Sequence, residues 1–438
     1  MSEPAIQSLL ARRIWDSRGR PTIEAEVVLS DGAFGRGIAP AGASRGSREA
    51  VEKRDGGTRL GGLDVQAALE GIRGEIARAL IGADPFDQSA VDDRLFALDG
   101  TGNLARLGGN SVTAVSLAVL NAAAASRRLP LWRYCLGDAE ALIPLPEIQI
   151  FGGGAHAGRR VDVQDFMVVA LGAECFAEAL EATAEVYRAA GQIMAERGLL
   201  QGVADEGGWW PAFASNEGAL DTLMLAIERA GFKPGEDIAV SLDVAASEFG
   251  RDGLYRLGVV KRELDRDGLA ELLLDWCARY PIVSIEDPFG EDDAIGFQRL
   301  VAAVGDRVQI IGDDLLVTSS ERVRQAARDG TVNAALIKVN QAGAVSRAKA
   351  ACDEALSAGF GAIVSARSGE TEDVAIAHLA IGWGAGQLKV GSFSRSERMA
   401  KWNEVLRIEE ALGAKARFAG ADVLPAQKRR RQTAERGP

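Results

Sequence analysis

The sequence predicts an α/β protein in which a compact α+β domain precedes repeated strand–helix units. Strand patterns come before helical patterns in the first ~140 residues, which is typical of an α+β domain. From about Pro144 onward, short apolar runs recur, and each ends in a polar or charged residue. From position 286 these marked residues fall at 286, 313, 338, 367 and 389, at intervals of 27, 25, 29 and 22. One strand plus one helix fits that interval, so the pattern favours a parallel sheet or an eight-fold barrel.

The expected N-terminal domain, residues 1–141, begins with strands. RPTIEAEVVLS (20–30) alternates like a half-buried strand and is followed by the turn sequence DG. A second strand in 32–47 runs into a loop rich in Gly, Ala and Ser, and helical patterns follow at 63–82, 87–98 and 111–128. The second domain, 142–424, carries the apolar runs, and a polar basic tail, 425–438, is expected to be disordered.

Composition narrows the possible functions. The chain has 438 residues, of which 47% are hydrophobic and 26% charged, as in an ordinary globular protein. The net charge of −12 argues against a nucleic-acid partner, although local cations could still hold a small anion. Four widely spaced cysteines indicate neither a disulfide framework nor a zinc site. With no run of ~20 apolar residues and no signal peptide, we expect a cytoplasmic protein without a membrane partner.

Three carboxylates are placed where strands of the second domain should end: Asp243, Glu286 and Asp313. If the strands form a barrel, these groups converge at one rim, where they repel one another unless a cation lies among them. Oxygen ligands favour a hard ion, Mg²⁺ before Mn²⁺ or Ca²⁺. The alternative is that each carboxylate only caps the helix that follows it.

Cationic side chains occupy further strand ends. Lys338 and Lys389 end two strands, and a lysine close to a metal and other cations should have a lowered pKa and can act as a general base. Solvated or ion-paired lysines are the alternative. Arg367 and Ser368 follow another strand and suit a phosphate or a carboxylate, because they offer a planar fork beside a hydroxyl.

Two glycine-rich loops add candidates. Glu206 lies in GVADEGG (202–208), where flanking glycines let a carboxyl approach a ligand closely. His156 lies in FGGGAHAG (151–158), and the other histidine, His378, sits in an apolar helical pattern that favours a structural role.

Many segments together resemble the enolase family, and their order along the chain is the same as in that family. They cover roughly residues 5–415: WDSRGRPTIEAEV, GASRGSREA, GGGAHAG, VQDFM, DEGG, SLDVAASEF, SIEDPFGEDD, GDDLLVT, IKVNQAG, SARSGETED and SRSERMAKWNEVLRIEE. The resemblance implies an α+β cap on a modified (β/α)₈ TIM-type barrel, usually assembled as a homodimer. It also implies the superfamily's established scheme, in which a Lys or His base works with Mg²⁺ that stabilises an ene-diolate.

The resemblance assigns roles to individual residues. Asp243, Glu286 and Asp313 become ligands of a first Mg²⁺, and Ser44, in a mobile loop, helps to bind a second.

The remaining roles concern the substrate. Lys338 becomes the base that removes the proton alpha to a carboxylate, and Lys389 holds that carboxylate. Glu206 assists departure of the C3 hydroxyl, while Arg367 and Ser368 hold the phosphate.

The chain departs from the family pattern at a few positions. Enolases have His where this chain has Ala366, Glu where it has Asp165, and Thr where it has Arg45. In enolases the positions of Ala366 and Asp165 lie near the C3 hydroxyl. We count Asp165 and His156 among the catalytic candidates, and Ala366 and Arg45 among the substrate-binding ones.

Three functions follow as hypotheses. The first is a specialised enzyme of phosphonate biosynthesis, similar to carboxyphosphonoenolpyruvate synthase, acting on a small phospho- or phosphono-carboxylate. The second is an ordinary enolase that converts 2-phosphoglycerate to phosphoenolpyruvate and water. The third is a non-catalytic enolase-like binding protein, against which the retained base and metal ligands argue.

Overall fold

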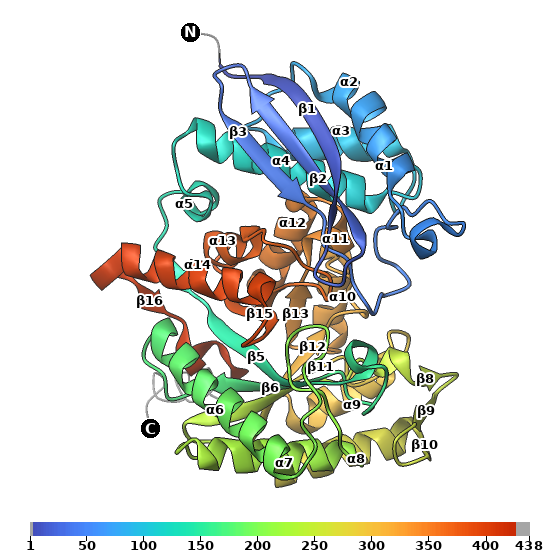
Figure 1. The fold of residues 1–438 in the computed structure, drawn as a ribbon, viewed down its shortest axis with the longest axis vertical. Coiled ribbons are helices and arrows are strands. Elements are labelled where there is room, and N and C mark those ends of the chain that lie inside the picture. Colours follow the sequence, from blue (N-terminus) through green and yellow to red (C-terminus); the bar gives the residue numbers. More distant parts are fainter. Residues whose placement is uncertain (1–2, 426–438) are drawn as a thin grey trace.

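The N-terminal domain is a three-stranded antiparallel sheet packed against helices (Figure 1). The computed structural model describes residues 3–425, so the predicted tail lies, from residue 426 on, outside the described residues. The sheet has the order β1-β2-β3, and helix α4 packs on β2 and β3. A Cβ at Gly35 would lie 2.2 Å from the backbone nitrogen of Ala122, and one at Gly37 would lie 2.3 Å from the carbonyl oxygen of Ala114. These glycines therefore allow the helix to approach the sheet closely. The elements of this domain are β1 (Ile6–Trp15), β2 (Pro21–Leu29), β3 (Phe34–Ile38), α1 (Gln66–Gly71), a π-helical turn (Ile72–Ile76), α2 (Ala77–Leu80), α3 (Gln88–Asp99), α4 (Gly109–Ser126) and α5 (Leu131–Leu136).

The second part of the chain is a closed eight-stranded barrel, which confirms the predicted fold class. Seven strands are parallel, but β6 runs antiparallel to both of its neighbours, β5 and β7. Residues 153–164 join β5 to β6, and their only helical segment is the 3-10 turn Gly154–Ala157, so no α-helical crossover restores the parallel direction here. The barrel strands are β5 (Leu145–Gly152), β6 (Asp165–Ala170), β7 (Ile238–Asp243), β11 (Ile282–Glu286), β12 (Gln309–Gly312), β13 (Ala334–Ile337), β14 (Gly361–Ser365) and β15 (Gly386–Ser392).

Helices surround the barrel, and several begin at side-chain caps. Asp265, Asp293 and Ser319 accept hydrogen bonds from backbone amides in the first turns of α8, α9 and α10. The helices are α6 (Phe176–Glu196), α7 (Asn216–Arg229), α8 (Arg266–Arg279), α9 (Ala294–Val304), α10 (Ser320–Asp329), α11 (Val339–Ala342), α12 (Val345–Ser357), α13 (Ala375–Gly382) and α14 (Ser396–Leu412). Short strands β8 (Gly250–Arg251), β9 (Leu254–Leu257) and β10 (Arg262–Asp265) form a separate sheet, and β4 (Leu142–Ile143) pairs with β16 (Arg417–Phe418).

The barrel interior is partly polar. Gln309 and Gln387 are fully buried, and each amide donates to the other's carbonyl oxygen at 3.0 Å. Mutual pairing satisfies both groups without water. The larger apolar core lies outside the barrel, between its strands and the surrounding helices.

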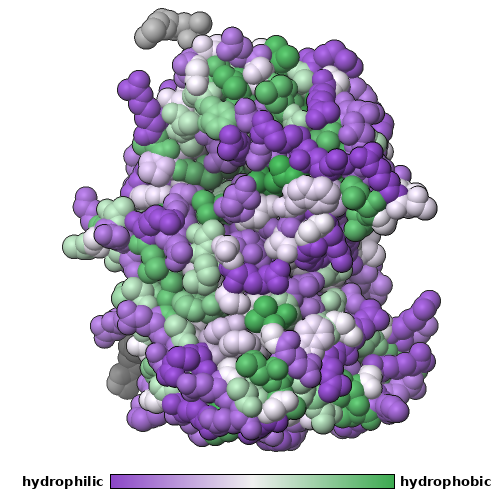
Figure 2. All heavy atoms as spheres, in the orientation of Figure 1, coloured by the Kyte–Doolittle hydropathy of each residue, from purple (hydrophilic) through white to green (hydrophobic). Residues whose placement is uncertain are grey.

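The two domains meet over the carboxyl ends of the barrel strands. Ala41 of the N-terminal domain pairs with Gly369 through two backbone hydrogen bonds of 3.0 and 2.8 Å. The segment 40–54, which we call the lid, thereby lies against the loop that follows β14. Polar and apolar side chains intermix on the face shown in Figure 2. Within residues 3–425, no helix combines the length and the apolar character that a membrane crossing requires.

Candidate active site

The predicted charged residues meet at one rim of the barrel. Asp243 and Glu286 are the last residues of β7 and β11, and Asp313 and Lys338 directly follow β12 and β13. Lys389 differs from the prediction that it ends its strand, because β15 continues to Ser392. The register of β15 shifts between Lys389 and Gly391, whose φ of 114° a glycine adopts readily.

Lys389 is the cation at the centre of the carboxylates. Its Nζ lies 2.8 Å from Asp243 Oδ2, 2.6 Å from Glu286 Oε2 and 3.4 Å from Asp165 Oδ2. Burial disfavours the charged lysine, but these three carboxylates outweigh burial and raise its pKa well above the ordinary value. The lysine therefore stays protonated and offsets the repulsion among the acids.

Lys338 is paired with Asp313, at 2.5 Å between Nζ and Oδ2. The pKa of Lys338 is raised, not lowered as the sequence predicts: burial lowers it, and Asp313 then raises it by more. A cation bound to Asp313 would weaken this attraction and favour the neutral amine. Gln341 donates to the other oxygen of Asp313 at 2.8 Å.

The acidic rim offers oxygen ligands of the kind that a hard cation prefers. Glu286 Oε1 and Gln164 Oε1 are buried and lack a hydrogen-bond partner among the described residues. Gln164 also donates to Asp243 at 3.0 Å. Burial, followed by the charge of Asp243, raises the pKa of Glu286 well above the ordinary value, although Lys389 opposes that rise. Buried, unsatisfied oxygens beside carboxylates fit Mg²⁺.

The closest groupings of metal-binding side chains within residues 3–425 differ from the predicted ligand set. Atoms of His156, Asp165 and Glu206 lie within 4.8 Å of one another, as do atoms of Asp287, Asp313 and Asp314. The set Asp243, Glu286 and Asp313 does not reach that mutual proximity in the described part of the chain, and Lys389 bridges the first two. The assignment of these three ligands, and of Ser44, stays a prediction.

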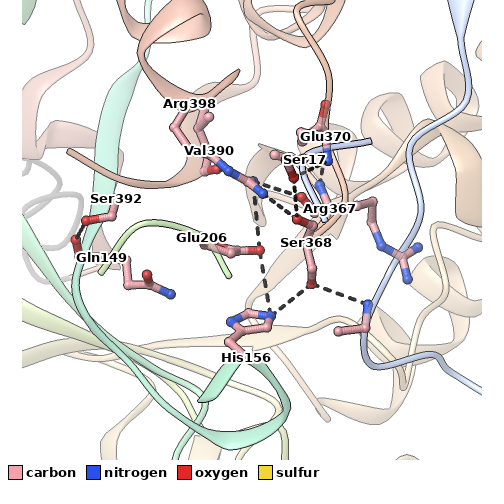
Figure 3. A network of polar contacts seen from close by, with 12 residues as sticks. Ser17, Gln149, His156, Glu206, Arg367, Ser368, Glu370, Val390, Ser392 and Arg398 are labelled. Atoms are coloured by element: carbon pink, nitrogen blue, oxygen red, sulfur yellow. Dashed lines mark hydrogen bonds and ion pairs between the residues drawn. The ribbon is translucent and has the colours of Figure 1, made fainter. Parts of the chain in front are cut away.

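His156 contacts three other candidate residues: Asp165, Ser368 and Glu206. Its Nδ1 lies 3.1 Å from Asp165 Oδ1. Its Nε2 lies 2.9 Å from Ser368 Oγ and 3.7 Å from Glu206 Oε1 (Figure 3). Asp165 is the first residue of β6, so the reversed direction of that strand brings it to the carboxyl-end rim. Burial lowers the pKa of His156, but Glu206 and Asp165 raise it by more, to about 9.

Arg398, at the start of α14, supports the loop that carries the predicted anion clamp. This arginine is fully buried and donates to the carbonyl oxygens of Arg367, Ser368 and Val390 at 2.6–2.8 Å (Figure 3). Its guanidinium also lies 3.9 Å from Glu206. Arg398 therefore fixes the backbone of the loop and places positive charge behind Glu206.

The predicted anion clamp, Arg367 and Ser368, is held by the lid. Arg367 Nη1 and Nη2 donate to the two carboxylate oxygens of Glu49 at 2.9 and 3.2 Å, and Nη2 donates to the carbonyl oxygen of Ser44 at 3.0 Å. A Cβ at Gly42 would lie 1.9 Å from Arg367 Nη2, so only glycine fits there. Arg45 is half-exposed and ion-paired with Glu52.

A small cavity lies between these groups. It has about 20 Å³ of space for the centre of a water molecule, and roughly one water fits in such a volume. Ala366 lies in its wall, 7% exposed, with its backbone N–H donating to the carbonyl oxygen of Lys389 at 2.9 Å. The cavity is lined by Ser44, His156, Gln164, Asp165, Glu206, Asp243, Lys338, Ser365, Ala366, Arg367, Ser368, Lys389, Val390 and Gly391.

Comparison with known families agrees with this architecture. Residues 6–135 match the model of the enolase N-terminal domain, and residues 140–427 match the enolase C-terminal TIM barrel domain. The chain belongs to the enolase family. The two enolase domains indicate a lyase-type enzyme, and the family generally uses Mg²⁺. The rim of this barrel carries acids, two lysines and the predicted clamp arginine.

Sequence reasoning missed four buried residues that hydrogen-bond to the predicted site residues: Glu49, Gln164, Gln341 and Arg398. Gln164 precedes Asp165 in VQDFM, and Gln341 and Arg398 lie in the quoted segments IKVNQAG and SRSERMAKWNEVLRIEE. Their presence in those segments was the available signal. Their partners, however, lie on other elements, which spacing along the chain does not identify.

Proposed function

We propose that this enolase-family protein removes the elements of water from a small phospho- or phosphono-carboxylate and forms an enolpyruvate ester. The observation that supports it most directly is the rim of the barrel. Lys338 and Lys389 stand there beside carboxylates, with the Arg367–Ser368 clamp and Glu206 around the same cavity.

The proposed reaction breaks a C–H and a C–O bond. Neutral Lys338 accepts the proton alpha to the substrate carboxylate, and the electron pair of the broken C–H bond becomes the new C=C bond. The C3–O bond breaks, and the hydroxyl leaves as water after taking a proton from Glu206. Lys389 holds the substrate carboxylate, whose developing charge a cation stabilises.

The magnesium sites belong to the same proposal. Asp243, Glu286 and Asp313 would hold one Mg²⁺, and Ser44 would contribute to a second. When bound, the metal supplies positive charge where the substrate becomes more negative. The protein's own residues place the substrate and transfer the protons.

We propose further that the substrate is larger than 2-phosphoglycerate and carries an additional carboxylate on phosphorus, as in carboxyphosphonoenolpyruvate synthesis. Ala366 in the cavity wall leaves space where enolases have His, and Asp165 is one methylene shorter than the family's Glu. Arg45 provides positive charge on the lid, but it must exchange its partner Glu52 for the ligand. Ordinary enolase activity is the second candidate, because base, clamp and acidic rim are all retained.

The test compares substrates with the Mg²⁺-loaded protein, following the ultraviolet absorbance of the enol ester. The expected parent dehydrates 2-phosphoglycerate poorly and prefers the substrate that bears phosphonoformate. The double variant Ala366→His with Arg45→Thr should shift the preference toward 2-phosphoglycerate by roughly 30- to 1000-fold, because pocket volume and a charge partner are lost together. A parent that dehydrates 2-phosphoglycerate at ordinary enolase rates would contradict the specialised substrate.

The assembly state is also a proposal. Enolases usually form homodimers, and we propose the same for this chain. Light scattering of the purified protein tests it, and a monomer at micromolar concentration would refute it.

A further inference from the structure

Glu49 is a buried carboxylate on the lid whose contacts connect the lid to the anion clamp. Its side chain accepts from the backbone N–H of Gly46 at 3.0 Å, from both terminal nitrogens of Arg367, and from Gln341 Nε2 at 3.3 Å. Glu49 is only 8% exposed. A carboxylate this buried is held in place by charge-assisted hydrogen bonds from Gly46 on the lid itself and from two segments distant in sequence, those of Gln341 and Arg367.

The contacts of Arg367 determine which of its edges can meet a ligand. Nη1 donates to Glu49 and, at 3.3 Å, to Asn340, while Nη2 donates to Glu49 and to the carbonyl oxygen of Ser44. All four hydrogens on Nη1 and Nη2 therefore have an acceptor within the protein. Among residues 3–425 the structure gives no acceptor to Arg367 Nε. The side chain lines the cavity beside Ser368, whose Oγ accepts from the backbone N–H of Ala43 at 3.3 Å.

We propose that Glu49 is the positioning residue of the anion clamp. It holds the guanidinium of Arg367 by its outer edge, so that Nε and the Ser368 hydroxyl face the phosphorus-borne anion of the substrate. This inference rests on the proposed function, which places that anion at Arg367. Because Glu49 is itself part of the lid, the clamp reaches its binding geometry only while the lid lies over the site.

Hydrogen bonds also connect Glu49 to Lys338, the proposed base. Gln341 donates to Glu49 and to Asp313, and Asp313 is the partner of Lys338. Lid, clamp and base therefore share one continuous hydrogen-bonded chain. Loss of Glu49 should weaken anion binding first, and should lower turnover through the misplaced substrate rather than through loss of the base.

The test uses the full-length protein with Mg²⁺ and measures the affinity for inorganic phosphate by calorimetry. Glu49→Gln keeps the shape but removes the charge that fixes the fork, so phosphate binding should weaken by on the order of tenfold or more. Glu24→Gln is the matched control, since Glu24 is 7% exposed and pairs with Arg12 on the N-terminal sheet. It should bind phosphate like the parent.

Unchanged phosphate affinity in Glu49→Gln would overturn the proposal. So would tighter binding, which would make Glu49 a competitor for the anion instead of a support. Glu49→Asp, which keeps the charge but withdraws it by one methylene, serves if Glu49→Gln does not fold. It should bind phosphate more weakly than the parent with kcat affected less than KM, and parent-like binding would again overturn the proposal.

The outcome is separable from that of the reaction. A parent that binds phosphate but dehydrates none of the tested substrates refutes the proposed reaction, while the comparison of Glu49→Gln with Glu24→Gln still decides the role of Glu49. A parent that binds no phosphate refutes the clamp itself and this inference with it.

Discussion

Lys338 is the residue on which the proposed chemistry depends most directly. Its amine reaches the cavity and its partner is Asp313, so Lys338→Ala removes the proton acceptor but leaves the acidic rim intact. Exchange of the alpha proton of 2-phosphoglycerate with deuterated solvent should fall to background. Mg²⁺ affinity should be retained or increased, because Asp313 loses its cationic partner. Proton exchange at the parent rate, followed by NMR, would remove Lys338 from the role of base.

His156 leads to a prediction about pH. Its pKa in the folded protein, about 9, lies above the ordinary value of 6.5, so the protonated form stabilises the fold. That contribution is fully present below about pH 6.5 and is lost as the pH rises through about 9; it amounts to a few kcal/mol. In EDTA, the unfolding free energy of the parent should therefore fall between these pH values relative to His156→Asn. The unfolding free energies of both proteins are measured by urea unfolding at pH 6, 7.5 and 9. The same change with pH in the parent and in His156→Asn would contradict this prediction.

At the residue scale, the sequence predicts well which residues lie at strand ends, and predicts contacts between domains poorly. Asp243, Glu286, Asp313 and Lys338 reach the rim because each follows an apolar run, and a strand end is visible in the pattern. Glu49 could not be found in this way. Its partner Arg367 lies 318 positions away, and their contact depends on how the lid folds onto the barrel.

Helix α14 is the element that supports the clamp, through Arg398. Arg398→Lys keeps a positive charge but cannot donate to three carbonyl oxygens in the same fork, so buried acceptors lose partners. The free energy of unfolding should fall by about 2–4 kcal/mol, and phosphate affinity should fall as well. Arg407→Lys, on the same helix but 64% exposed and paired with Glu404, should cost under about 0.5 kcal/mol. Equal stability losses in the two variants, measured by urea unfolding, would contradict the supporting role.

Strand directions and helix details were harder to predict than the elements themselves. The expected helices at 87–98 and 111–128 correspond to α3 (Gln88–Asp99) and α4 (Gly109–Ser126). The reversal of β6 was missed, because an apolar run carries no information about strand direction. Strand β1 was also missed, since its alternation of buried and exposed residues is irregular. The 63–82 helix is interrupted by a π-helical turn at Ile72–Ile76.

At the scale of the whole molecule, neither domain completes the site alone. The barrel contributes acids, lysines and Arg367 to the cavity, and the lid of the N-terminal domain contributes Ser44. Arg45 and Glu49 of the lid line a neighbouring pocket, whose wall also includes Arg367. The cavity admits roughly one water, so we infer that the lid must move for substrate to enter. The regular strand–helix interval predicted a barrel, but nothing in that interval shows that a loop from the other domain closes it.

Magnesium should stabilise the whole protein through the acidic rim, because a ligand that binds only the folded state adds to its stability by mass action. At a magnesium concentration a hundred times the dissociation constant, the gain in stability is about 2.7 kcal/mol.

Asp243→Asn should lose most of this gain, since a neutral amide at the end of β7 is a weaker partner for a hard cation. Asp237→Asn is the matched control: Asp237 directly precedes β7 and so lies at the opposite end of the same strand, where its carboxylate accepts from the backbone N–H of Lys233. Thermal unfolding with EDTA and with rising Mg²⁺ should show a parent-like magnesium response in Asp237→Asn and a reduced one in Asp243→Asn. Each variant is compared with itself in EDTA, which separates the loss of metal from the loss of the Lys389–Asp243 ion pair. If Asp243→Asn gained as much stability from magnesium as the parent, the cation would have to bind elsewhere, and the cluster of Asp287, Asp313 and Asp314 would become the next candidate.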